Sequence, residues 1–411
     1  MKRSKIRRRS RVFRRRRGGA VFGKVLLWLL VIPVAIGGYF LAQYLFEGGG
    51  GKPAIAPTAP TESTTATTPS QTPSATPTVP NVSDGANVKN MQALYLPASA
   101  LYAPETWTAT LEAASAAGYN AVIVDVKDAD GRLWYISSSP LAQTARAVQT
   151  KAVSVEVLTA LRDAWQEKWG LTLIPRVYAF RDHTAPRYLE NARVTVQGDT
   201  DAVWYDDKPD EGGRRWLNPY AEEARGYILE ITAELHGIGF PLLMLDGVQF
   251  PDQEARAYYG DAEQTALPRG DVLAGFAARM NEVVGKDGWM LTVGGMAAVG
   301  EKTGVYGANP ATFGVGVIAP WALPSSFGGK LTLGGATVAS PNSHPYEAAT
   351  LLFGQLKARL QLMESPPQAM PWLQAGGYNT ADVAAQVTAL REQLGADAPY
   401  VLYHPDGKYA F

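Results

Sequence analysis

The chain has 411 residues, 38 basic and 38 acidic side chains, and no cysteine, which excludes a disulfide framework and thiolate catalysis. The zero net charge hides an asymmetry. Residues 1–24 hold 12 Lys and Arg and no acid, while the remainder carries 26 basic and 38 acidic side chains. A short basic N-terminal segment followed by an acidic remainder indicates a membrane-orientation signal and argues against a nucleic-acid partner.

An apolar stretch follows the basic segment. Residues 25–46 contain no charged side chain, and 22 such residues can cross a bilayer as one helix. The Lys and Arg before it predict a cytoplasmic N-terminus and a C-terminal domain outside the cell membrane. A cleavable signal peptide is the alternative, but it usually has a shorter apolar region and an Ala-x-Ala-like site. We therefore expect an uncleaved, single-pass anchor.

Residues 47–87 form a segment rich in Gly, Pro, Thr and Ser. The segment has too few apolar side chains to build a core. We expect it to be a linker that holds the following domain, residues 88–411, away from the membrane.

Strand-like and helix-like segments alternate from residue 88 to the C-terminus. Strands are expected at 91–96, 121–126, 171–180, 241–245, 290–293, 315–319, 370–374 and 400–403. Helices are expected at 105–117, 153–169, 221–236, 272–284, 346–363 and 381–394. This order predicts an α/β protein with a (β/α)8 TIM barrel. An open doubly wound sheet is the rival fold, but it usually has a Gly-rich turn after its first strand, and none occurs here.

One predicted strand ends in a carboxylate. Residues 241–245 are mostly apolar, Asp246 follows, and Gly247 and Pro251 mark the exit into a loop. A continuous apolar run is typical of a strand buried on both faces of a parallel sheet. Because (β/α) barrels carry their chemistry at the C-terminal ends of the strands, Asp246 is a candidate catalytic residue. The alternative is that Asp246 caps a helix or pairs with a basic residue.

Other strand ends would meet Asp246 at one rim of such a barrel. Glycoside hydrolysis needs one carboxyl as acid and another as nucleophile or base. We predict Asp246 as nucleophile or base and Asp128 or Asp125 as the acid. Aromatic faces pack on sugar rings, and charged groups bind hydroxyls. The predicted substrate-binding residues are Lys127, Arg176, Asp182, Trp216, Trp321 and Trp372. Any one of these acids or tryptophans could instead belong to a turn or to the core.

Other chemistries have little support in the sequence. The four histidines lie far apart without the spacing of zinc ligands. Residues 295–303 resemble a phosphate-binding loop, but Glu301 interrupts the required Gly-Lys-Ser/Thr. No Gly-x-Ser-x-Gly nucleophile motif is present. We therefore expect no metal and no cofactor.

The same residues resemble a bacterial family known as the putative glycosyl hydrolase domain, usually found on anchored or exported proteins. The similarity covers about residues 90 to 411. It is carried by the run 124–128 with Gly131, by Arg176, Phe180 and Asp182, by Trp216 with 219–220, by Asp246 with 250–251, and by 344–347 and 371–374. The resemblance implies a TIM barrel related to glycoside hydrolases and a carbohydrate substrate.

The chain departs from the family pattern at four positions. The family typically has a Glu near Leu242, an aromatic residue at Gly247, an Arg at Gln249 and an Asp at Asn218. The missing Arg would have placed a positive charge near Asp246. Two functions therefore stay open. The first is a membrane-anchored, extracytoplasmic glycoside hydrolase acting on cell-wall or other polysaccharide. The second is a non-catalytic glycan-binding protein at the cell envelope.

Overall fold

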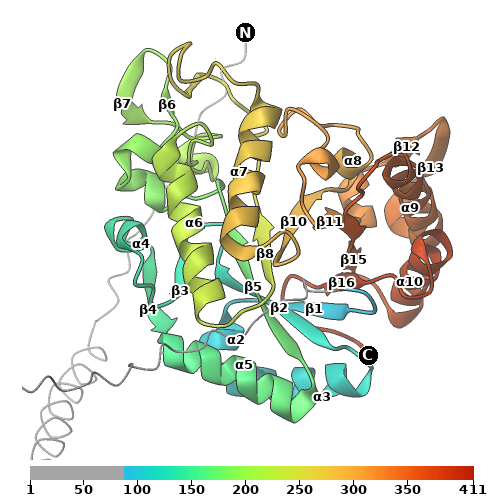
Figure 1. Ribbon diagram of the computed structural model, residues 1–411. Helices are drawn as coiled ribbons and strands as arrows, with labels where there is room; N and C mark the ends of the chain where they lie inside the picture. The colour runs from blue at the N-terminus through green and yellow to red at the C-terminus, as the bar shows by residue number, and fades with distance from the viewer. Residues whose placement is uncertain (1–87) are drawn as a thin grey trace, which may run out of the picture. The chain divides into compact units, whose positions relative to one another are not determined.

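Eight parallel strands close into a barrel in the computed structural model, which describes residues 88–411 (Figure 1). Each strand hydrogen-bonds to the next around the ring, and the pairing of β1 with β2 closes it. In ring order the strands are β1 (Gln92–Leu96), β2 (Ala121–Lys127), β5 (Thr172–Tyr178), β8 (Leu243–Asp246), β10 (Trp289–Gly294), β11 (Val317–Trp321), β15 (Trp372–Gln374) and β16 (Tyr400–Tyr403). The predicted TIM barrel is confirmed.

The predicted basic segment, membrane span and linker lie outside the described residues. Within residues 88–411 no helix has the length and apolar character needed to cross a bilayer.

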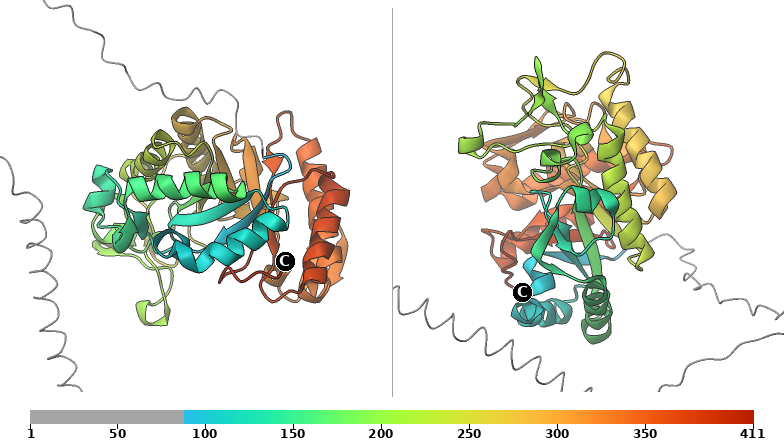
Figure 2. Two further views of the ribbon diagram at one scale, coloured as in Figure 1. Left: turned by 90° about the horizontal axis from the view of Figure 1, so that it is seen from below. Right: turned by 90° about the vertical axis from the view of Figure 1, so that its left-hand side faces the viewer.

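Helices cover the outside of the barrel (Figure 2). The six long ones are α3 (Thr108–Ala116), α5 (Val155–Trp169), α6 (Glu222–Gly237), α7 (Arg269–Val284), α9 (Pro345–Gln361) and α10 (Thr380–Leu394). Helices α6 and α7 pack side by side, as do α9 and α10 (Figure 1). Each was expected to within a few residues, because each has an apolar face and a clear stop. Gly170, for example, ends α5 with a φ of +67°, a conformation that glycine adopts without strain.

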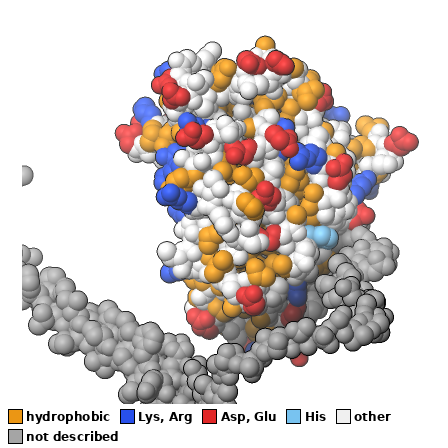
Figure 3. Space-filling view, turned by 60° about the vertical axis from the view of Figure 1, so that its left-hand side comes forward, with side chains coloured by type: hydrophobic (Ala, Val, Ile, Leu, Met, Phe, Trp, Pro, Cys, Tyr) orange, Lys and Arg blue, Asp and Glu red, His pale blue; other side chains and the backbone are white. Residues whose placement is uncertain are grey.

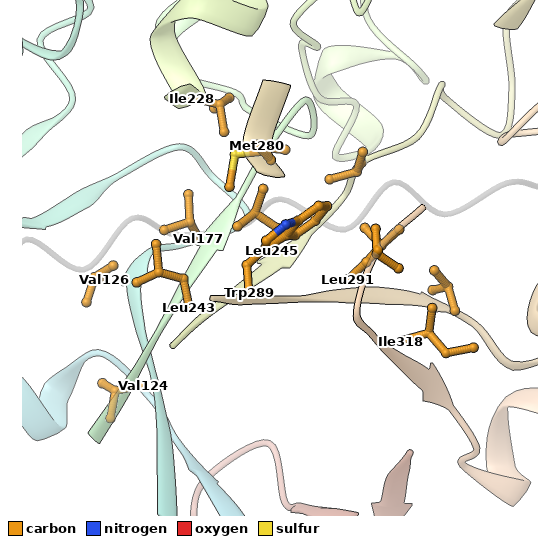
Figure 4. Close-up of a cluster of buried hydrophobic side chains, with 14 of the residues drawn as sticks. Val124, Val126, Val177, Ile228, Leu243, Leu245, Met280, Trp289, Leu291 and Ile318 are labelled. Carbon is orange, nitrogen blue, oxygen red and sulfur yellow. The ribbon is translucent and has the colours of Figure 1, made fainter. Parts of the chain in front are cut away.

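Alternation along the strands separates two apolar regions. Ile123, Ile174 and Met244 point into the barrel, while Val124 and Leu245 point outward to the helices. Figure 4 shows the outer layer, where strand residues meet Ile228 and Met280 from α6 and α7. Both faces of the strands are buried, which explains their nearly continuous apolar sequences.

Several elements were not expected from the sequence. β3 (Leu133–Tyr135) and β4 (Val148–Val153) extend the sheet beside β2, so the helix expected from residue 153 begins only at Val155, after the N-cap Ser154. The remaining additions are β6 (Thr195–Val196), β7 (Asp199–Val203) and β9 (Ala257–Tyr258) in one small sheet, the hairpin β12 (Lys330–Leu333) and β13 (Ala336–Ala339), the short strand β14 (Gln368–Ala369), and the short helices α2 (Ser99–Tyr102), α4 (Pro140–Thr144) and α8 (Gly295–Ala298). Short segments of this kind lack the periodicity that sequence reasoning uses.

Candidate active site

Three charged side chains meet inside the barrel near the C-terminal ends of β2, β5 and β8. Asp125 continues the inward-facing row of Ile123, and Asp246 continues the row of Met244. Arg176 lies opposite Asp125 in the register of β2 with β5. The period of two along each strand therefore aims all three at one point.

Arg176 joins the two carboxylates. Its guanidinium lies 2.5 Å from Oδ2 of Asp246 and 3.5 Å from Oδ1 of Asp125. The two contacting carboxylate oxygens must then lie within roughly 8 Å of each other, because both contact nitrogens of the same planar guanidinium. Burial by itself would lower the pKa of Arg176, but Tyr178 and the two aspartates together raise it well above its usual value. The guanidinium is therefore a permanent positive charge between two acids.

Aromatic rings surround this cation. The guanidinium carbon of Arg176 lies 4.6 Å from the ring centroid of Tyr178, 4.8 Å from that of Trp372 and 5.4 Å from that of Trp321. Rings at these distances stabilise a cation through their electron-rich faces. The surrounding rings thus help to keep a charged side chain that is only 2% exposed in one position.

Asp125 has the environment of a general acid. Burial raises the pKa of Asp125 to about 6, although Arg176 and a hydrogen bond of 2.8 Å from the Tyr95 hydroxyl act in the opposite direction. Tyr95 is itself held by Tyr409, whose hydroxyl donates to the Tyr95 carbonyl at 2.6 Å. A carboxyl with a pKa near neutral can hold and release a proton under ordinary conditions.

Asp246 has a different environment. Its Oδ1 accepts a hydrogen bond from the backbone N–H of Gly247 at 2.6 Å, and its Oδ2 accepts from Arg176. The neighbouring inward-facing residue on β10 is Thr292, because Leu245 and Leu291 are in register and Asp246 and Thr292 follow them. Thr292 is 2% exposed, and its hydroxyl has no hydrogen-bond partner within residues 88–411. A buried hydroxyl without a partner suits a substrate hydroxyl.

Two clefts open at the rim, although neither is lined by Asp125, Arg176 or Asp246 themselves. The insertion cleft, of ≈ 390 Å³, is lined by Arg181, Trp216 and Gln249 and by four acids, Asp206, Asp207, Glu211 and Asp252. The tryptophan cleft, of ≈ 370 Å³, is lined by Trp321, Tyr306 and Lys302, and again by Gln249 and Asp252. The shared residues make the clefts neighbours on the rim, where an extended ligand could contact both.

The predicted tryptophans take different positions. Trp321 is partly exposed and lines the tryptophan cleft, so it can offer a face to a sugar ring. Trp372 is fully buried and stacks on Trp321 with centroids 4.6 Å apart, so it supports that ring from inside the barrel. Trp216 is 4% exposed, and its Nε1 donates to Asp206 at 2.9 Å. Of the three, Trp321 has the position predicted for a platform, while Trp372 has no exposed face to offer.

Lys127 and Asp182 do not line the rim with the others. The register between β2 and β5 shifts between Asp125 and Lys127. Lys127 pairs with Asp182 at 2.6 Å, donates to the Tyr178 carbonyl at 2.7 Å and lies over the ring of Tyr227 on α6. Both charged side chains are 0% exposed. The structure thus gives their predicted substrate contact no support, and instead gives them a structural role.

Asp128 organises a turn. Its Oδ1 accepts hydrogen bonds from the backbone N–H of Asp130 and Arg132, and its Oδ2 accepts from Trp134 Nε1 at 3.0 Å. These contacts shape the connection from β2 to β3. Asp125, with one oxygen free of hydrogen bonds in the described part of the chain, is the better partner for Asp246.

The structure shows where the four residues that depart from the family pattern lie. Leu242 packs in the barrel interior, and Asn218 bridges backbone groups of Tyr220 and Tyr259. Gln249 accepts from the Tyr306 hydroxyl at 3.2 Å. Gly247 has a φ of +64°, and a Cβ there would lie 3.2 Å from Cβ of Arg181. Asp246 nevertheless has a positive partner in Arg176 on β5, a residue that the chain shares with the family pattern.

Sequence reasoning missed Tyr95, Tyr178 and Thr292. The alternation of side chains along each strand could have identified them. Each lies an even number of residues from an apolar residue of the barrel interior, so each points inward as well. No group of three or more His, Cys, Asp or Glu in residues 88–411 has the geometry of a metal site.

Comparison with known families gives a match over most of the chain. The model of the putative glycosyl hydrolase domain matches residues 93–409. No curated protein sequence matches the chain.

Solved structures give weaker similarities. A hypothetical protein from Ruminiclostridium thermocellum is 24% identical over 46% of this chain and 91% of its own, with a TM-score of 0.39. The pneumococcal exo-β-D-N-acetylglucosaminidase StrH is 12% identical over 79% of each chain, with a TM-score of 0.42. An α-galactosidase from Thermus thermophilus is 11% identical over 78% of this chain and 59% of its own, with a TM-score of 0.47. At these low values the similarities carry no conclusion about activity.

Proposed function

Because the chain belongs to the putative glycosyl hydrolase domain family, we propose that it hydrolyses a glycosidic bond with Asp125 and Asp246 as the carboxyl pair. The observation that carries the proposal is the convergence of these two acids on Arg176 at the barrel mouth. A mouth of this kind is where (β/α) barrels carry out chemistry.

The two acids have separate roles in the proposed reaction. Asp125 gives its proton to the glycosidic oxygen as the bond from that oxygen to the anomeric carbon breaks. Asp246 either attacks the anomeric carbon or takes a proton from the attacking water. Retaining enzymes place the two carboxyls about 5 Å apart and inverting enzymes about 6.5–9.5 Å apart, so the bound set by Arg176 accommodates both.

Other residues of the rim position the glycan in this proposal. Trp321 offers a partly exposed indole face to a sugar ring. The Thr292 hydroxyl beside Asp246 is enclosed and has no partner within residues 88–411, so a sugar hydroxyl that enters the barrel mouth could bond to it. The two neighbouring clefts favour a polysaccharide over a small sugar. The basic residues 1–24 and the apolar residues 25–46 support an anchored protein whose barrel meets cell-wall or other envelope glycan outside the membrane.

The test is reducing-end release from a panel of envelope and cell-wall glycans by the purified full chain. Asp246→Asn is the matched control because it keeps the shape of the side chain and removes its charge. We expect turnover of at least one glycan and its loss in the variant. Equal turnover by the variant would remove Asp246 from the mechanism.

A glycan-binding function without cleavage is the second candidate. The specific observation for it is that one guanidinium contacts both carboxylates, which are each only 8% exposed, so Arg176 neutralises the acids that catalysis would use. Glycan retention by the full chain with no released product would support this candidate.

A further inference from the structure

Two arginines that have no acidic partner within residues 88–411 lie with a histidine and a tyrosine beside the insertion cleft. We call it the Arg187–Arg215 cluster; it consists of Arg187, Arg215, His183 and the ring of Tyr205. Acidic and basic side chains are interspersed over the face shown in Figure 3. Within residues 88–411, however, no ion pair joins Arg187 or Arg215 to an acid.

Three N–H donors converge on the imidazole of His183. Arg215 approaches Nε2 at 2.9 Å through its side chain and Nδ1 at 3.2 Å through its backbone N–H. Arg187 approaches the same Nε2 at 3.3 Å. A neutral imidazole has one acceptor nitrogen, and a protonated one has none. The ring therefore cannot accept from all three donors. Arg215 also donates to the His183 carbonyl at 3.2 Å, whereas the exposed Arg187 side chain has no acceptor besides the ring within residues 88–411.

Nearby acids are already engaged elsewhere. Asp182 pairs with Lys127, and Asp130 pairs with Arg132 at 3.0 Å and with Arg214. Asp206 accepts from Trp216 Nε1 and from the backbone N–H of Arg214. The cluster itself thus keeps an excess of positive charge, whereas the wall of the adjoining insertion cleft carries the carboxylates of Asp206, Asp207, Glu211 and Asp252. Consistent with this excess, partial burial and then the charges of Arg215 and Arg187 lower the pKa of His183.

The cluster is adjacent to the proposed substrate path. The backbones of Arg181 and Trp216 pair as an antiparallel bridge, and both residues line the insertion cleft. His183 is two residues from Arg181, and Arg215 precedes Trp216. Tyr205 supports the guanidinium of Arg215 at 4.6 Å from the ring centroid, which holds a flexible side chain in place.

We infer that the Arg187–Arg215 cluster binds an oxyanion, a carboxylate or phosphate group carried by the glycan, and so selects an acidic polysaccharide. Two guanidinium groups offer the parallel donors that carboxylate and phosphate oxygens accept. The inference rests on the proposed function for the identity of the glycan, but the anion site itself can be tested without turnover.

The test follows the imidazole of His183 by NMR in the full chain, which has only four histidines. Glucuronate and inorganic phosphate are titrated separately, which distinguishes the two anions. Bound anion offsets the charges of Arg187 and Arg215, so we expect a saturable rise in the pKa of His183. Asp182 and Arg132 also act on this ring, and both are present in the wild-type chain and in the variants.

Arg215→Gln and Arg187→Gln should each abolish the response to added anion. Arg146→Gln is the matched control, because Arg146 also stacks on a tyrosine, Tyr188, at 4.8 Å but has no contact with His183. An unchanged His183 in the wild-type chain, or an Arg215→Gln chain that still responds, would overturn the inference.

Hydrolysis of acidic and neutral glycans separates this inference from the proposed function. A tenfold loss on the acidic glycan alone in Arg215→Gln supports both. Equal loss on both glycans, or none, overturns the acidic preference and leaves the hydrolase standing. If the chain binds the anions but hydrolyses no glycan, the anion site is supported and the proposed hydrolase function is wrong.

Discussion

Asp125 and Lys127 lie two residues apart on β2, and each is buried and paired, but their surroundings differ. Lys127 and Asp182 are 0% exposed and face α6, where backbone groups and the Tyr227 ring complete their environment. Asp125 and Asp246 are each 8% exposed, share one guanidinium and lie at the barrel mouth.

The difference separates charge that maintains the fold from charge that is available for chemistry. A fully enclosed pair whose two charges already satisfy each other gains nothing from a ligand. A pair at the mouth keeps some exposed surface, so a substrate can contact it. Burial alone is therefore not a sign of function, and four measurements can test this distinction.

Lys127→Met should have the largest effect on stability. Removing one partner of a buried ion pair leaves the other charge unpaired and typically costs about 3–5 kcal/mol. We expect a loss of this size in the free energy of unfolding, measured by chemical denaturation. The double variant with Asp182→Asn should recover part of the loss. A fully stable Lys127→Met chain would show that the pair does not support the fold.

Asp246→Asn should have a large effect on activity and a smaller effect on stability than Lys127→Met. Turnover should fall by about 10²–10⁴-fold, the usual contribution of a positioned acid or base. The melting temperature should fall less than in Lys127→Met, because the Asp246 side chain is 12% exposed and the remaining guanidinium keeps Asp125 as a partner. A larger stability loss than in Lys127→Met would break the comparison.

Tyr95→Phe should change the pH dependence of turnover. A general acid must be protonated, so activity should fall as pH rises through the pKa of Asp125, about 6. The Tyr95 hydroxyl lowers this pKa by donating to the carboxylate. Its removal should move the falling limb to higher pH in a profile of kcat/KM. If the falling limb of the pH profile did not move, Asp125 would not be the general acid.

Thr292→Val should have the smallest effect. The change replaces a hydroxyl that lacks a partner by a methyl of similar size. We expect thermal stability to stay equal or rise, while glycan affinity falls about fivefold, or about 1 kcal/mol for one lost hydrogen bond. Thr292→Ser should keep the affinity. A destabilised Thr292→Val chain would indicate a structural partner for the hydroxyl.

Much of the fold could be predicted from the sequence. Apolar runs and helical periodicity gave eight strands and six helices in the correct order, because these patterns depend on local geometry. β3, β4 and the small sheet of β6, β7 and β9 could not be predicted, since their pairing depends on distant segments. Among the candidate residues, Asp125, Arg176, Asp246 and Trp321 meet at the rim, whereas Lys127, Asp182 and Trp372 are enclosed.

By itself the sequence determined the barrel and the placement of Asp246 at a strand end, because buried parallel strands need continuous apolar runs that end where the loops begin. Only the tertiary structure decided which acid faces Asp246. A shift in register between β2 and β5 turns Lys127 toward α6, and Arg176 on β5 bridges Asp125 and Asp246. Such choices depend on contacts between strands that are far apart in the chain, and no local pattern records them.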